Sequence, residues 1–483
     1  MVFSSPLFLF VFLPVVLTVY GLLWGIKIRN LFLLVASLFF YAWGEPVFVL
    51  LLLASTVANF FLGRWVERAE EPARRKLIVG AAIVFNIGLL CLFKYTNWAA
   101  ATVNSLLHFA GVAPVHVPTI RLPLGISFFT FHALSYVIDI FRRKWQAARH
   151  PGDVALYIFF FPQLIAGPIL RWNAIGPQLA KRTMRRDLFA EGVRRFVGGL
   201  AKKALIANTV AWPADQIFSL PADQLSTPVA WFGVLCYTLQ IYFDFSGYSD
   251  MAIGMGKMFG FEFMENFQFP YISQSIREFW RRWHISLSTW FRDYLYIPLG
   301  GNRISERRTY FNLVVVFFLC GLWHGANWTF VAWGLYHGIF LALERTRLGD
   351  WEARWPRWLR HVYALLVVMM GWVIFRSVTL SACGKFFAAL LGQKPAPLAE
   401  PLARYATHPV VCALTVGIIF AGPAWAWLKS AAARVDQNLP QPYRPLLQIT
   451  GEVLEIGLVV ILFVASAAWL ANGTYNPFIY FRF

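Results

Sequence analysis

Two histidines in a strongly apolar stretch are the residues of this chain best suited to chemistry. His324 and His337 lie in the segment GLWHGANWTFVAWGLYHG, and a glycine follows each of them. A neutral imidazole can accept a proton from an attacking hydroxyl or thiol, and a water-poor pocket strengthens that role. We interpret both as catalytic candidates, and the alternative is a structural pair that packs between helices. Metal binding is a weaker hypothesis, because no carboxylate or cysteine stands between the two.

Carboxylates inside apolar segments form a second set of candidates. The segment YFDFSGYSD contains Asp244 and Asp250. A charged group costs about 2.5 to 3.5 kcal/mol at the centre of a membrane helix, so each carboxylate needs a partner or a function. They could orient a histidine, bind substrate hydroxyls or pair with arginine, and a satisfied structural network is the alternative. His132 and Asp139 lie near one helical face, and we expect them to form a structural hydrogen-bonded pair.

Arginine and aromatic residues alternate in the stretch 274–300. This mixture is typical of a helix at the level of the lipid headgroups. Arg277, Arg281 and Arg282 could bind the phosphates of a ligand that arrives from the cytoplasm. Anchoring to lipid headgroups is the alternative function of these arginines.

The elements that position these residues must be membrane helices. Of the 483 residues, 58% are hydrophobic and 14% are charged, whereas soluble domains carry about 25% charged residues. Apolar runs long enough to span a bilayer recur along the chain. They predict an all-α polytopic membrane protein with about 11 to 13 transmembrane helices. The spans are expected near 7–26, 31–44, 47–62, 78–94, 121–141, 196–212, 228–250, 310–325, 328–344, 360–376, 409–428 and 450–471.

Basic residues gather in alternate connections between these spans. With the N-terminus outside the cytoplasm, all but seven of the 43 Lys and Arg fall on the cytoplasmic side, as the positive-inside rule requires. Residues 1–6 contain no Lys or Arg, and no small-residue cleavage signal follows, so we expect the first span to be retained. The net charge of +19 is therefore assigned to membrane topology, and no nucleic-acid partner is predicted.

Two further features concern the membrane interior. The apolar stretch 154–170 is interrupted by Pro162 and by the turn at Gly167, which predicts a re-entrant segment. The five cysteines occur singly in mostly apolar runs. We interpret all five as small buried hydrophobic residues, without disulfide or metal chemistry.

Taken in order, several motifs resemble the membrane-bound O-acyltransferase family. They are FFTF with SYVID, FPQLIAGPI, FDFSGYSDMAIG, the long run SIREFWRRWHISLSTWFRDYLYIPLGGNR, and the segment with the two histidines. The opening MVFSS, the segments YAWGEP and FKYTNW, and the ending YFRF resemble the bacterial branch that O-acetylates alginate and peptidoglycan. The resemblance covers nearly the whole chain.

The resemblance implies one membrane-embedded domain over residues 1–483, with helices around a central tunnel. Its parts would be N-terminal helices at 1–120, a catalytic core at 121–346 and C-terminal helices at 347–483. His132 stands where close relatives are expected to have Gln, so it receives no catalytic role. The resemblance assigns the active-site histidine to His324, and it assigns residues that line or support the tunnel to His337, Asp244, Asp250, Asn266 and His284.

The same resemblance implies acetyl-CoA as a cytoplasmic donor, with Arg277, Arg281 and Arg282 near its phosphates and no permanently bound cofactor or metal. The acetyl group would cross the bacterial inner membrane to a periplasmic or membrane-anchored partner of the SGNH serine hydrolase type, which would complete transfer to a polysaccharide. Within the family, transfer of a D-alanyl or fatty acyl group is the alternative. Outside it, a transporter or flippase would also carry intramembrane His, Asp and Arg, but no inverted repeat supports that class.

Overall fold

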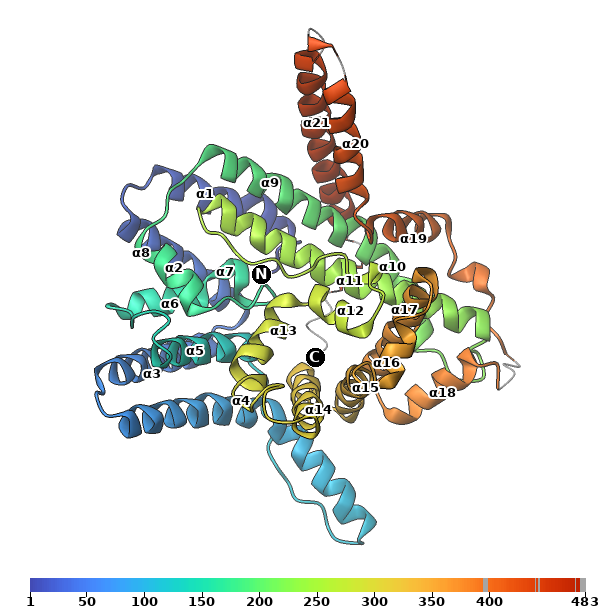
Figure 1. Cartoon of the computed structure of the whole chain (residues 1–483), viewed down its shortest axis with the longest axis horizontal. Coiled ribbons are helices and arrows are strands. Elements are labelled where there is room, and N and C mark those ends of the chain that lie inside the picture. The colour runs from blue at the N-terminus through green and yellow to red at the C-terminus, as the bar shows by residue number, and fades with distance from the viewer. Residues whose placement is uncertain (394–397, 439, 442–443, 474, 478–483) are drawn as a thin grey trace. The chain divides into compact units, whose positions relative to one another are not determined.

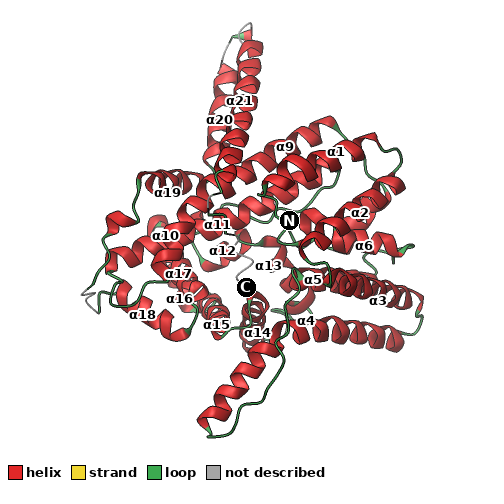
Figure 2. Ribbon diagram, turned by 180° about the vertical axis from the view of Figure 1, so that it is seen from behind, coloured by secondary structure: helices red, strands yellow, loops and turns green. Residues whose placement is uncertain are grey.

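A computed structural model describes residues 1–393, 398–438, 440–441, 444–473 and 475–477. All regular secondary structure in these residues is helical (Figures 1 and 2), which confirms the predicted all-α fold. The chain divides into two compact units. Unit 1 contains residues 1–193 and 252–264, and unit 2 contains residues 194–251 and 265–483. The single domain inferred from the sequence, with its three parts, stays a prediction, and so does the tunnel.

Unit 1 is built mainly from the N-terminal helices. A π-helical turn at Phe8–Phe12 leads directly into the first α-helix. The helices are α1 (Leu13–Leu22), α2 (Ile26–Gly44), α3 (Phe48–Arg68), α4 (Pro72–Phe109), α5 (Ile126–Phe141), α6 (Pro151–Phe159), α7 (Phe161–Leu164) and α8 (Trp172–Ala180). Two further helices, α9 (Arg186–Ala201) and α11 (Thr227–Met258), contribute residues to both units.

The helix α4 is much longer than the span predicted at 78–94. Its 38 residues extend over about 57 Å at 1.5 Å per residue, almost twice the roughly 30 Å of a hydrocarbon core. The segment after it returns along the helix, where the side chains of Asn97 and Asn104 hydrogen-bond the backbone of Ile120 and Val115. The residues after 94 include three consecutive alanines, which favour helix continuation.

The stretch 154–170 is interrupted, as the sequence predicts. Its helix α6 ends at Phe159, α7 covers one turn that includes Pro162, and no α-helix covers 165–170. Every residue from 154 to 170 is buried. The interruption is thus a feature of the protein interior, and its position as a re-entrant membrane segment stays a prediction.

The predicted hydrogen bond between His132 and Asp139 is wrong. Neither ring nitrogen of His132 has a hydrogen-bond partner among the described residues, and the ring lies edge-on to Tyr157. Asp139 accepts a hydrogen bond from the backbone N–H of Asn173 at 3.2 Å. Residues seven apart share a helical face but are separated by two turns, about 10 Å, which is too far for the direct contact.

Unit 2 contains most of the candidate residues. Its elements are a π-helical segment (Lys202–Ala207), α10 (Asn208–Phe218), a short turn (Pro270–Ile272), α12 (Ile276–Arg282), α13 (Ile285–Phe291), a second π-helical segment (Arg292–Tyr296), α14 (Glu306–His324), α15 (Trp328–Leu343), α16 (Arg347–Glu352), α17 (Arg357–Arg376), α18 (Leu380–Leu390), a turn (Leu402–Arg404), α19 (His408–Phe420), α20 (Ala424–Asn438) and α21 (Arg444–Ala471). The helices α20 and α21 lie side by side in both views (Figures 1 and 2).

The helices α14 and α15 form a hairpin whose backbones approach closely at two glycines. A Cβ on Gly334 would lie 2.2 Å from the carbonyl oxygen of Phe317, and one on Gly321 would lie 2.3 Å from that of Phe330. The side chain of Asn327 accepts a hydrogen bond from the N–H of Thr329 and caps α15. Small residues and a cap thus place the end of α14 directly beside α15.

Several helices are suited to crossing a membrane. Among the described residues, α2, α3, α4, α17 and α21 are long and apolar enough, and α19 with α20 would add a sixth span if this pair, bent by 61°, counts as one. The helices at the predicted spans 121–141 and 328–344 are shorter, with 16 residues each. The prediction that all five cysteines are buried is wrong for two of them. Cys91 on α4 and Cys412 on α19 are exposed.

Candidate active site

His324 is the last residue of α14 and lies against three aromatic rings. Its ring centroid is 4.9 Å from that of Trp323, 5.0 Å from Trp333 on α15 and 5.3 Å from Phe375 on α17. Only 9% of its surface is exposed. The imidazole is therefore held in apolar surroundings and keeps a small accessible surface, which is the environment expected for a proton acceptor in a water-poor site.

His337 lies in the same aromatic cluster and is fully buried. Its ring centroid is 5.1 Å from Trp333 and 5.2 Å from Trp280. On α17, a Cβ added to Gly371 would lie 2.7 Å from its Nε2 atom, so this glycine makes room for the ring. One indole, that of Trp333, thus contacts both candidate histidines.

The aromatic cluster also contains buried N–H groups that lack a partner. The indole N–H groups of Trp280 and Trp333 and both ring nitrogens of His337 form no hydrogen bond within the described residues. The indole of Trp372, in the same cluster, donates to the hydroxyl of Tyr271 at 3.1 Å. An unsatisfied buried polar group costs about 1 to 3 kcal/mol. A ligand oxygen such as a carbonyl would match the unpaired donors.

His284 connects α12 to α13 and has an unusual backbone conformation. Its φ is +44°, a left-handed conformation that is uncommon for a residue other than glycine and is often found at functional sites. The ring is fully buried and lies 4.6 Å from Phe245 and 6.1 Å from Trp323, centroid to centroid. Since Trp323 precedes His324, this contact brings a third candidate histidine next to the cluster.

The prediction of a single amphipathic helix at 274–300 is therefore wrong. The chain forms two short helices that are broken at Trp283 and His284. Trp280, Trp283 and Trp290 are buried in the protein, whereas an interfacial helix would expose its aromatic residues to lipid. These tryptophans therefore pack in the protein interior.

Asn266 orients His284. Its side-chain oxygen lies 3.1 Å from Nδ1 of His284 and accepts a hydrogen bond from the Ser286 hydroxyl at 2.9 Å. Its amide nitrogen donates to the Ser249 hydroxyl on α11 at 2.9 Å. Two of the five residues predicted to line or support the tunnel, Asn266 and His284, are thus brought together.

The two predicted carboxylates pair with cations on α9 and on the π-helical segment that follows it. Asp244 lies 2.7 Å from the ammonium of Lys203, and these side chains are 1% and 2% exposed. Asp250 contacts Lys202 at 2.6 Å and Arg195 at 2.8 Å. These pairs agree with the satisfied structural network that was the alternative to a functional role in the sequence analysis. A role of the carboxylates in substrate binding stays a prediction.

The three cations of this network, Arg195, Lys202 and Lys203, were not predicted from the sequence. Lys202 and Lys203 are adjacent within the predicted span 196–212, and charged residues inside a span are themselves a functional signal. They begin the π-helical segment Lys202–Ala207, and local π-helical turns are frequent at functional sites. The consecutive lysines could therefore have been singled out from the sequence.

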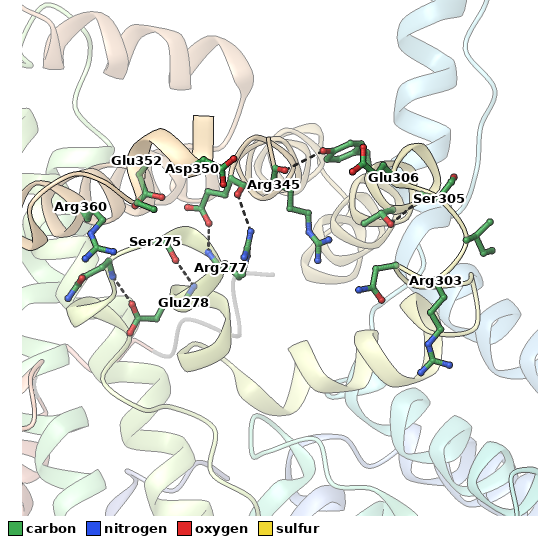
Figure 3. A pocket seen from close by; sticks show the side chains of 18 residues that line it. Ser275, Arg277, Glu278, Arg303, Ser305, Glu306, Arg345, Asp350, Glu352 and Arg360 are labelled. Carbon is green, nitrogen blue, oxygen red and sulfur yellow. Dashed lines mark hydrogen bonds between the residues drawn. The ribbon is translucent and has the colours of Figure 1, made fainter. Parts of the chain in front are cut away.

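A polar cavity of about 840 Å³ lies beside α12, the start of α14 and α16 (Figure 3). Glu344 forms part of its wall, where its carboxylate accepts hydrogen bonds from the backbone N–H groups of Ile276 and Arg277. Burial, followed by the charge of Glu344, raises the pKa of Glu352. The charged residues of the lining are Arg277, Arg303, Arg345, Arg360, Glu278, Glu306, Glu344, Asp350 and Glu352.

The three arginines predicted to act together are separated in the structure. Arg277 lines the cavity, whereas Arg281 and Arg282 are not part of its lining. Arg281 is exposed, and Arg282 hydrogen-bonds the Glu278 carboxylate at 2.9 Å. The arginines that join Arg277 come from the turn before α14 and from the region after α15, which the sequence alone does not bring together.

Comparison with known proteins agrees with the family expected from the motifs. Residues 126–377, which include every predicted site residue, match the model of the membrane-bound O-acyltransferase family. A probable alginate O-acetylase of Azotobacter vinelandii is 43% identical over the full length of both chains. A peptidoglycan O-acetyltransferase of Helicobacter pylori is 36% identical over 81% of this chain and 80% of its own. A teichoic acid D-alanyltransferase of Bacillus subtilis is 30% identical over 52% of this chain and 68% of its own.

A match to the family model over more than half of the chain, together with a relative of 43% identity along its whole length, settles the assignment. The helices that are long and apolar enough to span a membrane agree with it. The chain therefore belongs to the membrane-bound O-acyltransferase family and is a multi-pass membrane acyltransferase.

Proposed function

We propose that the protein passes acetyl groups from cytoplasmic acetyl-CoA across the bacterial inner membrane for the O-acetylation of a polysaccharide. Full-length similarity to a probable alginate O-acetylase, and similarity over most of the chain to a peptidoglycan O-acetyltransferase, support the acetyl group and the polysaccharide. The structural observation that carries the proposal is the aromatic cluster, in which His324 lies beside Trp333, whose indole N–H has no hydrogen-bond partner among the described residues.

In the proposed reaction His324 acts as the general base. It accepts the proton of the attacking hydroxyl as the oxygen forms a bond to the acyl carbon and the carbon–sulfur bond of the thioester breaks. Coenzyme A then leaves as a thiolate, which takes up the proton from His324. The indole N–H groups of Trp280 and Trp333 are suited to donate to the carbonyl oxygen as its negative charge grows. Low exposure of the site excludes water, which would otherwise hydrolyse the acyl group.

The polar cavity is the proposed entrance for the donor. Its arginines suit phosphates, and its carboxylates can accept hydrogen bonds from ribose hydroxyls. Glu344 in the cavity wall follows Trp333 by eleven residues, about 16 Å along a helix. An extended pantetheine arm can bridge this distance, so the phosphates could remain in the cavity while the thioester reaches His324.

The proposed acceptor side involves a second protein. By the resemblance of the sequence, a periplasmic or membrane-anchored partner of the SGNH type takes the acetyl group and completes its transfer to the polysaccharide. Transfer of D-alanine is the second candidate, because a teichoic acid D-alanyltransferase is a relative. That match covers about half of this chain, whereas the match to the O-acetylase covers all of it, which favours acetyl.

Transfer in inside-out membrane vesicles tests the proposal. Acetyl-CoA with tritium in its adenine and carbon-14 in its acetyl group is added outside, with and without an SGNH-type partner in the lumen. We expect carbon-14 to enter the lumen, bound to the partner or the polysaccharide, while tritium stays outside. Entry of both labels together would indicate a transporter, and transfer from a D-alanyl carrier protein but not from acetyl-CoA would favour the second candidate.

Charge reversal of the cavity arginines should weaken use of the donor. In the same vesicles, the double variant Arg277→Glu with Arg345→Glu is expected to raise the KM for acetyl-CoA at least tenfold, because each change replaces a phosphate-binding cation with a repelling carboxylate. The matched variant carries Arg281→Glu with Arg282→Glu, outside the cavity. If only the matched variant raised the KM, the donor would bind the exposed face predicted from the sequence.

A further inference from the structure

Arg195 on α9 binds two carboxylates that are distant from each other in the sequence. Its Nη1 atom donates to Glu265 at 2.5 Å, and its Nη2 atom bonds the second oxygen of the same carboxylate. The Nη2 atom also donates to Asp250 on α11 at 2.8 Å. A guanidinium held by two carboxylates has a fixed position, because its planar fork matches a carboxylate with two parallel hydrogen bonds.

The segment bound by Arg195 continues directly into the residue that orients His284. Glu265 precedes Asn266 in the chain, so one peptide bond connects the ion pair to the amide that contacts His284. On α11, Ser249 binds the other end of the Asn266 side chain. Two successive residues of the segment are thus tied down, one by the guanidinium of Arg195 and the other by the hydroxyl of Ser249.

The backbone at His284 needs this support. A left-handed conformation costs an ordinary residue of order 1 kcal/mol or more and persists only where surrounding contacts maintain it. Asn266 supplies those contacts, because its side-chain oxygen lies 3.1 Å from Nδ1 of His284 and its backbone oxygen accepts a hydrogen bond from Ile285 at 2.9 Å. If the segment shifted, His284 could relax and its ring would leave Trp323.

We infer that Arg195 is a positioning residue of the acyltransferase: through Glu265 and Asn266 it holds the ring of His284 against Trp323, beside His324. The inference rests on the proposed function, in which His324 is the general base, and it adds that His284 supports the proton transfer at His324. It goes beyond that function because it assigns a catalytic consequence to an ion pair that touches neither substrate nor His324.

The first experiment compares two neighbouring arginines. Arg195→Ala is expected to lower kcat for acetyl transfer about tenfold to a hundredfold, the loss expected from a slightly misplaced catalytic group, with an unchanged KM for acetyl-CoA. The matched control is Arg194→Ala, because Arg194 lies on the same helix but contacts Glu455 at 3.7 Å. Its kcat should stay within about twofold of wild type, as for most surface substitutions. Arg195→Lys keeps the charge without the fork and should recover part of the activity.

A double-mutant cycle with His284 separates positioning from general stability. In a His284→Ala background, Arg195→Ala should cause no further loss of kcat, because the residue that it positions is already absent. Turnover is measured per mole of monodisperse protein. Should Arg195→Ala fail to yield such protein, Glu265→Gln breaks the same ion pair with a smaller change and takes its place in the cycle.

The outcomes distinguish the inference from the function on which it rests. Losses that multiply in the Arg195→Ala, His284→Ala double variant would overturn the positioning role, and so would a fully active His284→Ala variant. Both results would leave the proposed function intact as long as His324→Ala is inactive. An active His324→Ala variant would instead overturn the proposed mechanism itself.

Discussion

His324→Ala is expected to abolish acyl transfer while the protein still folds and inserts. The change removes the proposed proton acceptor, and loss of a general base typically costs about 10² to 10⁴ in rate. The residue ends α14 and is followed by Gly325, so an alanine can be accommodated without a clash. The measurement is acetyl transfer per mole of monodisperse protein, which separates lost chemistry from lost protein.

His337→Ala is the internal comparison for this experiment. His337 contacts the same tryptophan as His324 but is more deeply buried. Its replacement should lower activity less completely, through the position of Trp333 or through a substrate contact, and should lower stability more because it leaves a cavity. Near wild-type turnover by His324→Ala would end the assignment of this residue as the base.

The candidate site could be predicted from the sequence where the signal is local. The motif around His324 and His337 combines small residues with a cap at Asn327, and these features also fix the α14–α15 hairpin. The break at Pro162 is another local signal, because proline cannot continue the hydrogen-bond pattern of a helix. The spans expected at 310–325 and 328–344 correspond to α14 and α15, and the interruption expected in 154–170 is also present.

Features that depend on distant partners could not be predicted in the same way. Arg303, Arg345 and Arg277 line one cavity although they belong to separate segments, and the amphipathic pattern of 274–300 is compatible with one helix. His284, at the break, contacts Asn266, which is 18 residues away in the chain. Such contacts require the tertiary structure, since hydropathy and helical period contain no information about them.

The proposed base, His324, lies in an aromatic cluster. Tryptophan and phenylalanine rings exclude water and lower the local dielectric constant, which strengthens each remaining hydrogen bond. In unit 2, Arg195, Lys202, Asp250 and Glu265 pair with one another in a network of ion pairs. These carboxylates are therefore paired with cations, and proton transfer in the proposed mechanism is assigned to His324.

Lys203→Met is the second substitution for which we expect a large effect, in this case on stability. Lys203 and Asp244 form an ion pair that is almost completely buried. Removal of one partner leaves an uncompensated charge in the interior, which typically costs about 3 to 5 kcal/mol. We expect a much lower yield of monodisperse protein and a lower melting temperature in detergent, measured against wild type at the same protein and detergent concentrations.

The double variant Lys203→Met with Asp244→Leu shows which function Asp244 has. Replacement of both charges by apolar side chains removes the desolvation penalty, so the melting temperature should return toward that of wild type. If the double variant is stable and also transfers acetyl groups, the pair is structural and Asp244 does not bind substrate. A stable but inactive double variant would instead support the substrate-binding role predicted from the sequence. Unchanged stability of Lys203→Met alone would contradict a stabilising role of the buried ion pair.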